Sequence, residues 1–176
     1  MSAWNIGRID SIKNLLQNTK IIRTVKGPVM DIIESECIFG KSRINQEILF
    51  FKAQDKIEFR TKLSWYEKGT PKTGIPLLRV SFPLGIMSAK AVYEIPFGAI
   101  ERPNNGQEAP ALKWLDYSDG KFGIALLNNA KYGHNVQGNQ VELTLIRSPY
   151  FPDLNPDSGE HTFSYCLCPH EGNWQE

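Results

Sequence analysis

The sequence predicts an all-β fold, with two packed antiparallel sheets and little helix. Several segments alternate apolar and polar residues with a period of two, as in 57–66, where Ile57, Phe59 and Leu63 alternate with polar neighbours. This pattern is typical of a strand with one face on a core and the other in water. Turn residues separate the alternating segments, and no long segment has helical periodicity. We therefore expect one β-sandwich domain spanning residues 1–176.

The expected elements follow in order along the chain. Asp10 is a candidate cap for two helical turns over 10–17, with Ile12 and Leu16 among the inward side chains. The three cations of 20–26 indicate a strand with a solvated face. Eight to eleven strands are expected in total, and after residue 26 they are assigned to 29–39, 42–53, 57–66, 77–82, 88–95, 111–115, 122–128, 141–145 and 162–167.

Composition excludes several classes of protein. Of 176 residues, 41% are hydrophobic and 22% charged, with a formal net charge of +1, which is ordinary for a globular domain. No basic stripe suggests a nucleic-acid partner, and no apolar run approaches the roughly 20 residues of a membrane span. The N-terminus lacks the pattern of a signal peptide. Three cysteines make no disulfide framework, so we expect a reducing, cytoplasmic location.

Two groups of residues suggest chemistry without establishing it. Cys166 and Cys168 stand two apart on one expected strand face, which is poor spacing for a zinc site even with His170 nearby. No metal is therefore expected in this chain. Glycoside hydrolysis needs two carboxylates roughly 5–9.5 Å apart, a distance that sequence spacing does not fix. Asp116 and Asp119 flank a Ser-Asp-Gly turn and are interpreted as turn residues.

The run from Tyr93 to Pro103 is the most informative stretch of the chain. It is predicted to be a strand that ends at a Pro/Gly corner and opens into the polar loop 104–108. Hydrophobic patterning does not require polar residues there. Because functional residues concentrate in long loops on a β framework, this loop is a candidate site.

Several segments, in order, resemble a known family. They are Ala3–Gly7; 57–61 with 65–68; Leu78–Pro83; Tyr93–Gly98 through Glu101–Pro103; Lys113–Asp116; Gly123–Gly133; Leu143–Pro149; and Gly159–Tyr165 ending in Pro169–His170. Together they span nearly the whole chain, which resembles the C-terminal region of glycoside hydrolase family 38 α-mannosidases. The resemblance implies a sandwich of the galactose mutarotase-like fold.

The resemblance also implies that this chain is an excised part of a larger enzyme, with Met1 as a cloning start. The parent would hydrolyse terminal α-D-mannose residues with retention, and its zinc and catalytic residues would lie in an N-terminal barrel that is missing here. No catalytic residue and no cofactor are therefore expected in these residues. The expected partners are that barrel, a helical domain, and mannosides or oligosaccharides. An apolar face exposed where the barrel packs would also let two copies associate.

In that setting, ten residues are candidates for the wall of the sugar cleft: Glu101, Arg102, Asn104 and Asn105; Lys131, Tyr132 and His134; and Asp157, Gly159 and Glu160. A different class of function stays open. A free-standing mutarotase-like enzyme would need an acid and a base across a pocket, from His134 or His161 with Glu101 or Glu160. A carbohydrate-binding module is a further alternative.

Overall fold

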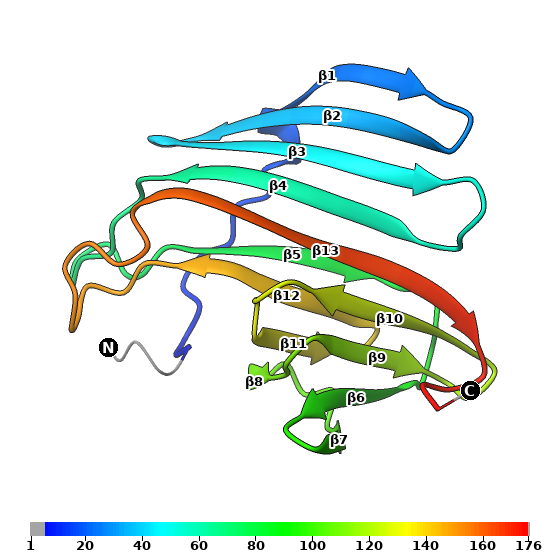
Figure 1. Ribbon diagram of the computed structural model, residues 1–176. Helices are drawn as coiled ribbons and strands as arrows, with labels where there is room; N and C mark the ends of the chain where they lie inside the picture. The colour runs from blue at the N-terminus through cyan, green and yellow to red at the C-terminus, as the bar shows by residue number, and fades with distance from the viewer. Residues whose placement is uncertain (1–5, 176) are drawn as a thin grey trace.

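The computed structural model describes residues 6–175 and confirms the all-β prediction, because two antiparallel sheets form nearly all of the regular structure (Figure 1). The predicted motif at 3–7 begins outside the described residues. The larger sheet has nine strands in the order β1-β2-β3-β4-β13-β10-β9-β6-β7. Their bounds are β1 (Thr19–Lys26), β2 (Met30–Phe39), β3 (Ser42–Phe51), β4 (Ile57–Trp65), β6 (Lys90–Ile95), β7 (Gly98–Arg102), β9 (Trp114–Ser118), β10 (Phe122–Asn128) and β13 (Gly159–Glu171).

The smaller sheet has four strands in the order β5-β12-β11-β8. Their bounds are β5 (Leu77–Pro83), β8 (Ala109–Pro110), β11 (Gly133–Gln137) and β12 (Gln140–Arg147). The last long strand, β13, inserts between β4 and β10 in the larger sheet. It therefore joins the N-terminal strands β1–β4 to β10, β9, β6 and β7.

The core lies between the two sheets and follows the period-two pattern of the sequence. Trp65, Tyr93, Leu115 and Leu126 from the larger sheet meet Leu143 from the smaller one, and all five side chains are buried. The indole nitrogen of Trp65 also donates a hydrogen bond to a buried serine hydroxyl after β12, at 2.6 Å. A buried indole N–H needs such a partner, so this bond holds the two sheets in register.

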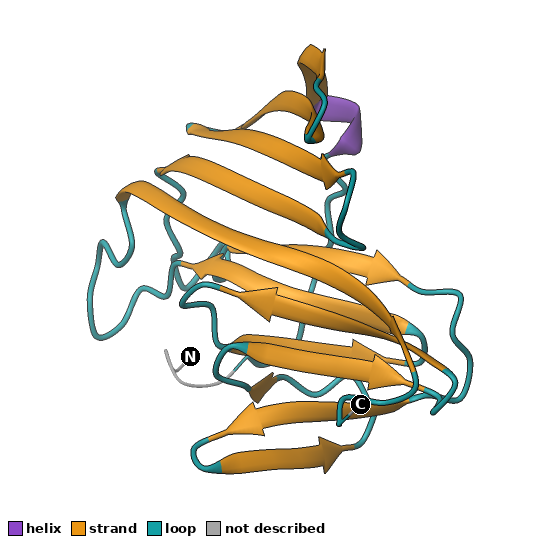
Figure 2. Cartoon of the chain, turned by 45° about the vertical axis from the view of Figure 1, so that its right-hand side comes forward, coloured by secondary structure: helices purple, strands orange, loops and turns teal. Residues whose placement is uncertain are grey.

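The larger sheet extends well beyond the smaller one. Figures 1 and 2 show β1, β2 and β3 projecting past the four-stranded sheet, so these strands have no second sheet over their inner face. We call this inner face the overhang, defined by Ile21, Ile33, Ile48 and Phe50, which the strand register places on the same side as the core. Ile21 is 69% exposed and Phe50 37% exposed, so the overhang presents apolar surface to solvent.

Two predicted elements are wrong. Residues 10–17 do not form two turns of helix: only a 3-10 turn, η1 (Leu16–Asn18), is present, and Ile12 is 86% exposed. The apolar side chains of this segment have no deep surface to bury against, so packing does not stabilise a helix there. The predicted strand at 111–115 is mostly absent: residues 111–113 connect β8 to β9, and only Trp114 and Leu115 lie in a strand, β9.

The strand pairs 29–39 with 42–53 and the solvated strand at 20–26 are confirmed as β2 with β3 and as β1. No helix in residues 6–175 is long and apolar enough to cross a bilayer.

Candidate functional site

The segment after β7 is held along the edge of the smaller sheet. The backbone of Asn105 forms a bridge to Gln137, and the amide of Gly106 donates to the carbonyl of Val136 at 2.9 Å. The side-chain amide of Asn135 donates back to the carbonyl of Gly106 at 2.6 Å. Strand β8 then pairs with the start of β11. The predicted polar loop therefore runs antiparallel to β11 as an irregular edge, and its backbone is fixed by hydrogen bonds.

The residues at the start of this edge have different environments. Glu101 is exposed and pairs with Lys90, with 3.0 Å between the carboxylate oxygen and Nζ. The guanidinium of Arg102 lies over the ring of Tyr93, 5.4 Å from its centroid. The amide nitrogen of Asn104 donates to a backbone carbonyl just before β6 at 2.8 Å. Arg102 and Asn104 are thus held against the sandwich, and Glu101 faces solvent.

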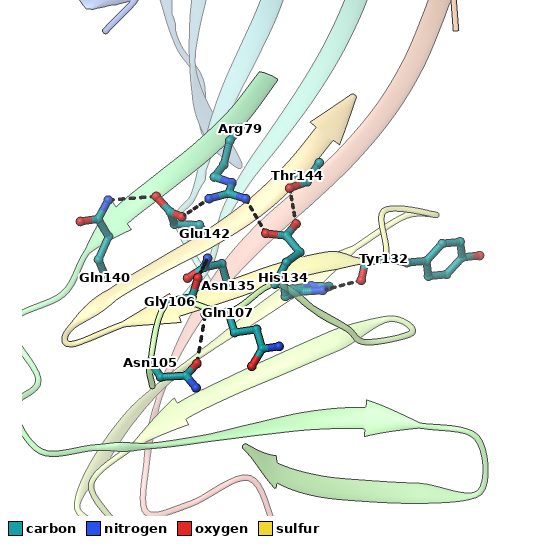
Figure 3. A network of polar contacts seen from close by, with 11 residues as sticks. Arg79, Asn105, Gly106, Gln107, Tyr132, His134, Asn135, Gln140, Glu142 and Thr144 are labelled. Carbon is teal, nitrogen blue, oxygen red and sulfur yellow. Dashed lines mark hydrogen bonds and ion pairs between the residues drawn. The ribbon is translucent and has the colours of Figure 1, made fainter. Parts of the chain in front are cut away.

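A charged network on the outer face of the smaller sheet fixes the other end of the edge (Figure 3). Glu108 accepts hydrogen bonds from the Arg79 guanidinium and the Thr144 hydroxyl. Arg79 also donates to Glu142 at 2.6 Å. The side chains of Arg79, Glu108 and Glu142 are only 12%, 18% and 16% exposed. Charges so little exposed must be paired, so Glu108 anchors the segment to β5 and β12.

His134 is buried and neutral. It lies in β11 with no exposed surface. Asn128 accepts a hydrogen bond from the Lys131 amide through Oδ1, at 2.7 Å, so its Nδ2 faces His134 Nε2 at 3.4 Å. Nε2 must then be the acceptor, and Nδ1–H donates to the carbonyl of Tyr132 at 3.2 Å. Burial lowers the pKa of His134 to about 4. This side chain therefore carries no charge at neutral pH.

Lys131 and Tyr132 lie just before β11, beside the loop that contains Asp157. The ammonium of Lys131 lies 4.3 Å from the centroid of the Phe163 ring. Desolvation lowers the pKa of Lys131, and the nearby charge of Asp157 opposes that shift. The ring of Tyr132 is 55% exposed. Lys131 and Asp157, candidates from two different segments, thus lie near each other.

Gly159 and Glu160 form the first residues of β13. The carboxylate of Glu160 accepts hydrogen bonds from the Ser64 hydroxyl at 2.9 Å and the Tyr66 hydroxyl at 3.2 Å. The hydrogen bond to Glu160 is the main cause that raises the pKa of Tyr66. Glu160 is therefore tied to the end of β4, and its carboxylate acts as an acceptor for two hydroxyls.

The structure places most of the ten candidates in two groups, and the buried His134 belongs to neither. Asn105 lies beside Gln137, at the end of β11, and Tyr132 precedes its first residue (Figure 3). A five-residue strand separates the groups by about 15 Å. The first group is Glu101, Arg102, Asn104 and Asn105, and the second is Lys131, Tyr132 and Asp157. Gly159 and Glu160 lie apart, because Glu160 is tied to Ser64 and Tyr66 at the end of β4. A single small ligand does not span both groups.

The interpretation of Asp116 as a turn residue is wrong. It lies inside β9 with 1% exposure, accepts from the Ser118 hydroxyl at 2.7 Å, and lies 2.6 Å from His170 Nε2. The sequence did carry a signal, because Asp116 sits between the inward-facing Leu115 and Tyr117 in an alternating strand. No sequence signal indicated its partner His170, which lies 54 positions further along the chain.

The cysteines of β13 are not a metal site. Cys166 Sγ and Cys168 Sγ lie 3.7 Å apart on one face, as predicted, and both are free thiols. Burial, reinforced by the neighbouring Cys168, raises the pKa of Cys166 to about 12. Within residues 6–175, no three His, Cys, Asp or Glu side chains lie close enough together to hold a metal ion.

The fold defines the class of protein, a two-sheet antiparallel β-sandwich. Residues 1–155 match the family described as "Glycosyl hydrolases family 38 C-terminal domain", and the chain belongs to this family. Two crystal structures share the fold: a family 38 protein from Enterococcus faecalis and an α-mannosidase from E. faecalis V583. Each has a TM-score of 0.71 and 17% identity, covering 88% of this chain and 23% or 22% of the other.

Curated relatives are more similar in sequence. Mouse "Alpha-mannosidase 2C1" is 40% identical over 147 residues, covering 79% of this chain and 14% of the mouse protein. "Alpha-mannosidase G" of Dictyostelium discoideum is 38% identical over 144 residues, covering 77% of this chain and 13% of the relative. The chain thus spans about one seventh of the length of these relatives. Their names therefore describe proteins much longer than this chain.

Proposed function

We propose that this chain is the C-terminal sandwich of a zinc-dependent, retaining α-mannosidase that hydrolyses terminal α-D-mannose residues. The observation that carries the proposal is the 38–40% identity to proteins named α-mannosidases over more than three quarters of the chain. In such a parent, zinc and the catalytic carboxylates would be supplied by residues outside this chain. The sandwich would support the catalytic domain and form part of the cleft wall.

A comparison of two proteins tests this proposal. The isolated chain and the parent enzyme that contains it are assayed with an aryl α-mannoside, with and without a zinc chelator. We expect turnover only by the parent, lost on chelation and restored by added zinc, with the α-anomer of mannose released first. Turnover by the isolated chain would refute the supporting role, and a parent that is inactive on α-mannosides would refute the proposed activity.

The cleft-wall role is assigned first to the edge that begins at Arg102. Arg102 and Asn105 carry planar hydrogen-bonding groups. The backbone of Arg102 is fixed by pairing with β6 in the larger sheet and that of Asn105 by its bridge to β11 in the smaller one, and fixed groups lose little entropy when they bind a sugar. In the parent enzyme, Arg102→Ala and Asn105→Ala should each lower kcat/KM about tenfold, the size of one polar contact. Arg60→Ala is the matched control, because Arg60 is paired with Glu58 on the outer face of β4. Unchanged kinetics in both test variants would exclude this edge from the cleft.

The overhang is the proposed contact with the rest of the parent. Its apolar side chains lie on the core side of the larger sheet, where the smaller sheet does not reach. Apolar surface of this kind is typical of a domain interface. Ile21→Lys and Phe50→Lys should leave the isolated chain folded and should lower the melting temperature of the parent. If the overhang instead joins two copies, the isolated chain will sediment as a dimer and these substitutions will make it monomeric.

We place the parent in the cytosol. The three free thiols, of which Cys166 and Cys168 lie side by side, support a reducing compartment. Fractionation of cells that express the parent from its own gene tests this location.

The mutarotase-like alternative has no support in the positions of its candidate residues. His134 is neutral, with both ring nitrogens engaged, and Nε2 of His161 contacts the carbonyl of Asp157 at 2.7 Å. Glu160 binds two hydroxyls at the end of β4, and Glu101 pairs with Lys90 at the far edge of the sheet. No acid and base of this set face each other.

A further inference from the structure

The outer face of the larger sheet carries a cavity of about 300 Å³ that the proposed function does not use. Trp114 and Asp116 alternate with the buried Leu115 in β9, so both point away from the smaller sheet. Ala125 and Leu127 lie opposite them on β10. The solvent face of an antiparallel sheet is normally polar, so an apolar hollow there needs an explanation. The lining residues are Trp114, Asp116, Ala125, Leu127, His170, Glu171, Asn173 and Trp174.

The polar floor of the cavity is built across three strands. His170 on β13 reaches over β10 to place Nε2 2.6 Å from the carboxylate of Asp116 on β9. It passes directly above Gly123, where an added Cβ would lie 2.3 Å from His170 Cε1. Glycine is therefore required for this crossing. The side chain of His170 remains 25% exposed, and the buried Asp116 acts on it from below as a positioning residue.

The cavity wall is aromatic. After β13 the chain turns back over the sheet, and the ring of Trp174 packs against that of Trp114, with centroids 5.4 Å apart and an interplanar angle of 30°. Trp174 is 43% exposed. Leu127 and Ala125 continue this apolar surface, and Glu171 and Asn173 also line the cavity. The cavity thus combines a flat apolar wall with hydrogen-bonding groups along one side.

We propose that this cavity binds the ring of a neutral pyranose sugar. A pyranose has one flat face of C–H groups, which packs against indole rings, and a rim of hydroxyls, which hydrogen-bond to carboxylate, amide and imidazole groups. The carboxylate of Asp116 is already engaged by His170 and Ser118, so the floor does not offer an unpaired charge to a cation. A volume at the lower end of the range for ligand pockets fits one sugar ring.

This site lies on the sheet face opposite the core and is separate from the proposed cleft wall. The inference does not depend on the α-mannosidase proposal, because it concerns binding by this chain alone. A ligand of this size held by one aromatic wall should bind with a dissociation constant of about 1 mM.

The test is a titration of the isolated chain with methyl α-D-mannopyranoside, followed by saturation-transfer NMR and calorimetry. The linear polyol mannitol is the matched ligand control, since it has the hydroxyls and lacks the flat ring face. We expect saturable binding of the mannoside, at least tenfold weakened by Trp174→Ala and largely restored in Trp174→Phe. Gly123→Ala should weaken it as well by displacing His170. Phe97→Ala, at the exposed turn between β6 and β7, should leave it unchanged.

Two results would overturn the inference. One is the lack of saturable binding up to about 100 mM mannoside, far above the expected dissociation constant. The other is equal binding by Trp174→Ala and the unsubstituted chain, or equal binding of mannitol and the mannoside. Trp174 is half exposed and lies at the end of the chain, so its substitution tests the cavity without removing core packing.

Discussion

Lowering the pH from 7 to 4 should destabilise this domain through one buried side chain, His134. Burial lowers its pKa from 6.5 to about 4 in the folded chain. Between these values the unfolded chain binds the proton and the folded chain does not, so stability is complete above pH 6.5 and is lost as the pH falls towards 4. Each pKa unit corresponds to about 1.4 kcal/mol, so the loss is about 3 kcal/mol.

Chemical denaturation of the unsubstituted chain and of His134→Gln at several pH values measures this effect. Carboxylates also titrate in this range, but they do so in both proteins, so the difference between the two curves isolates His134. The stability gap between them should be about 3 kcal/mol larger at pH 7 than at pH 4. NMR titration of the ring should show Nδ1 protonated and Nε2 bare at pH 7. A gap that changes by less than about 1 kcal/mol would refute the neutral, Asn128-oriented imidazole.

Three further changes have clear expected outcomes. Glu108→Gln should cost about 2–3 kcal/mol of folding free energy, because the guanidinium of Arg79 loses a charged partner where its side chain is only 12% exposed. In the same denaturation assay the exposed control Glu101→Gln should cost less than about 1 kcal/mol. Trp65→Phe should cost about 2 kcal/mol and lower the melting temperature, because a buried serine hydroxyl loses its 2.6 Å donor. Alkylation of Cys166 in the folded chain should be slow at pH 8 and fast after unfolding, since its pKa is raised to about 12.

The period-two pattern predicted most strands and which of their faces are buried. The alternation around Phe59 and Leu63 placed both side chains on the core side, as β4 confirms. The pattern failed at residues 10–17, where a helical spacing of apolar residues has no packing surface to bury them. The polar residues after Arg102 were correctly predicted to lie outside the regular strands. Their form, an edge fixed along β11, depends on hydrogen bonds to residues about 30 positions away.

The candidate residues were predicted one segment at a time, and the fold places those segments apart. Asn105 and Tyr132 are both candidates for the cleft wall, but only the order of the sheet shows that they lie at opposite ends of one strand. Asp116 was assigned to a turn because an Asp close to a Ser-Asp-Gly sequence is most often a turn residue. Its hydrogen-bond partner, His170, stands at the end of β13, and the two strands are separated by β10.

By itself, the sequence determined the all-β class, the buried face of most strands and the resemblance to the family to which the chain belongs. These properties depend on residues that are neighbours along the chain, where alternation and turn chemistry act. Only the tertiary structure decided that β13 lies between β4 and β10, that His134 is neutral, and that His170 crosses Gly123 to reach Asp116. Such contacts join residues that are distant in sequence, and the burial and charge of each group depend on what the other strands place around it.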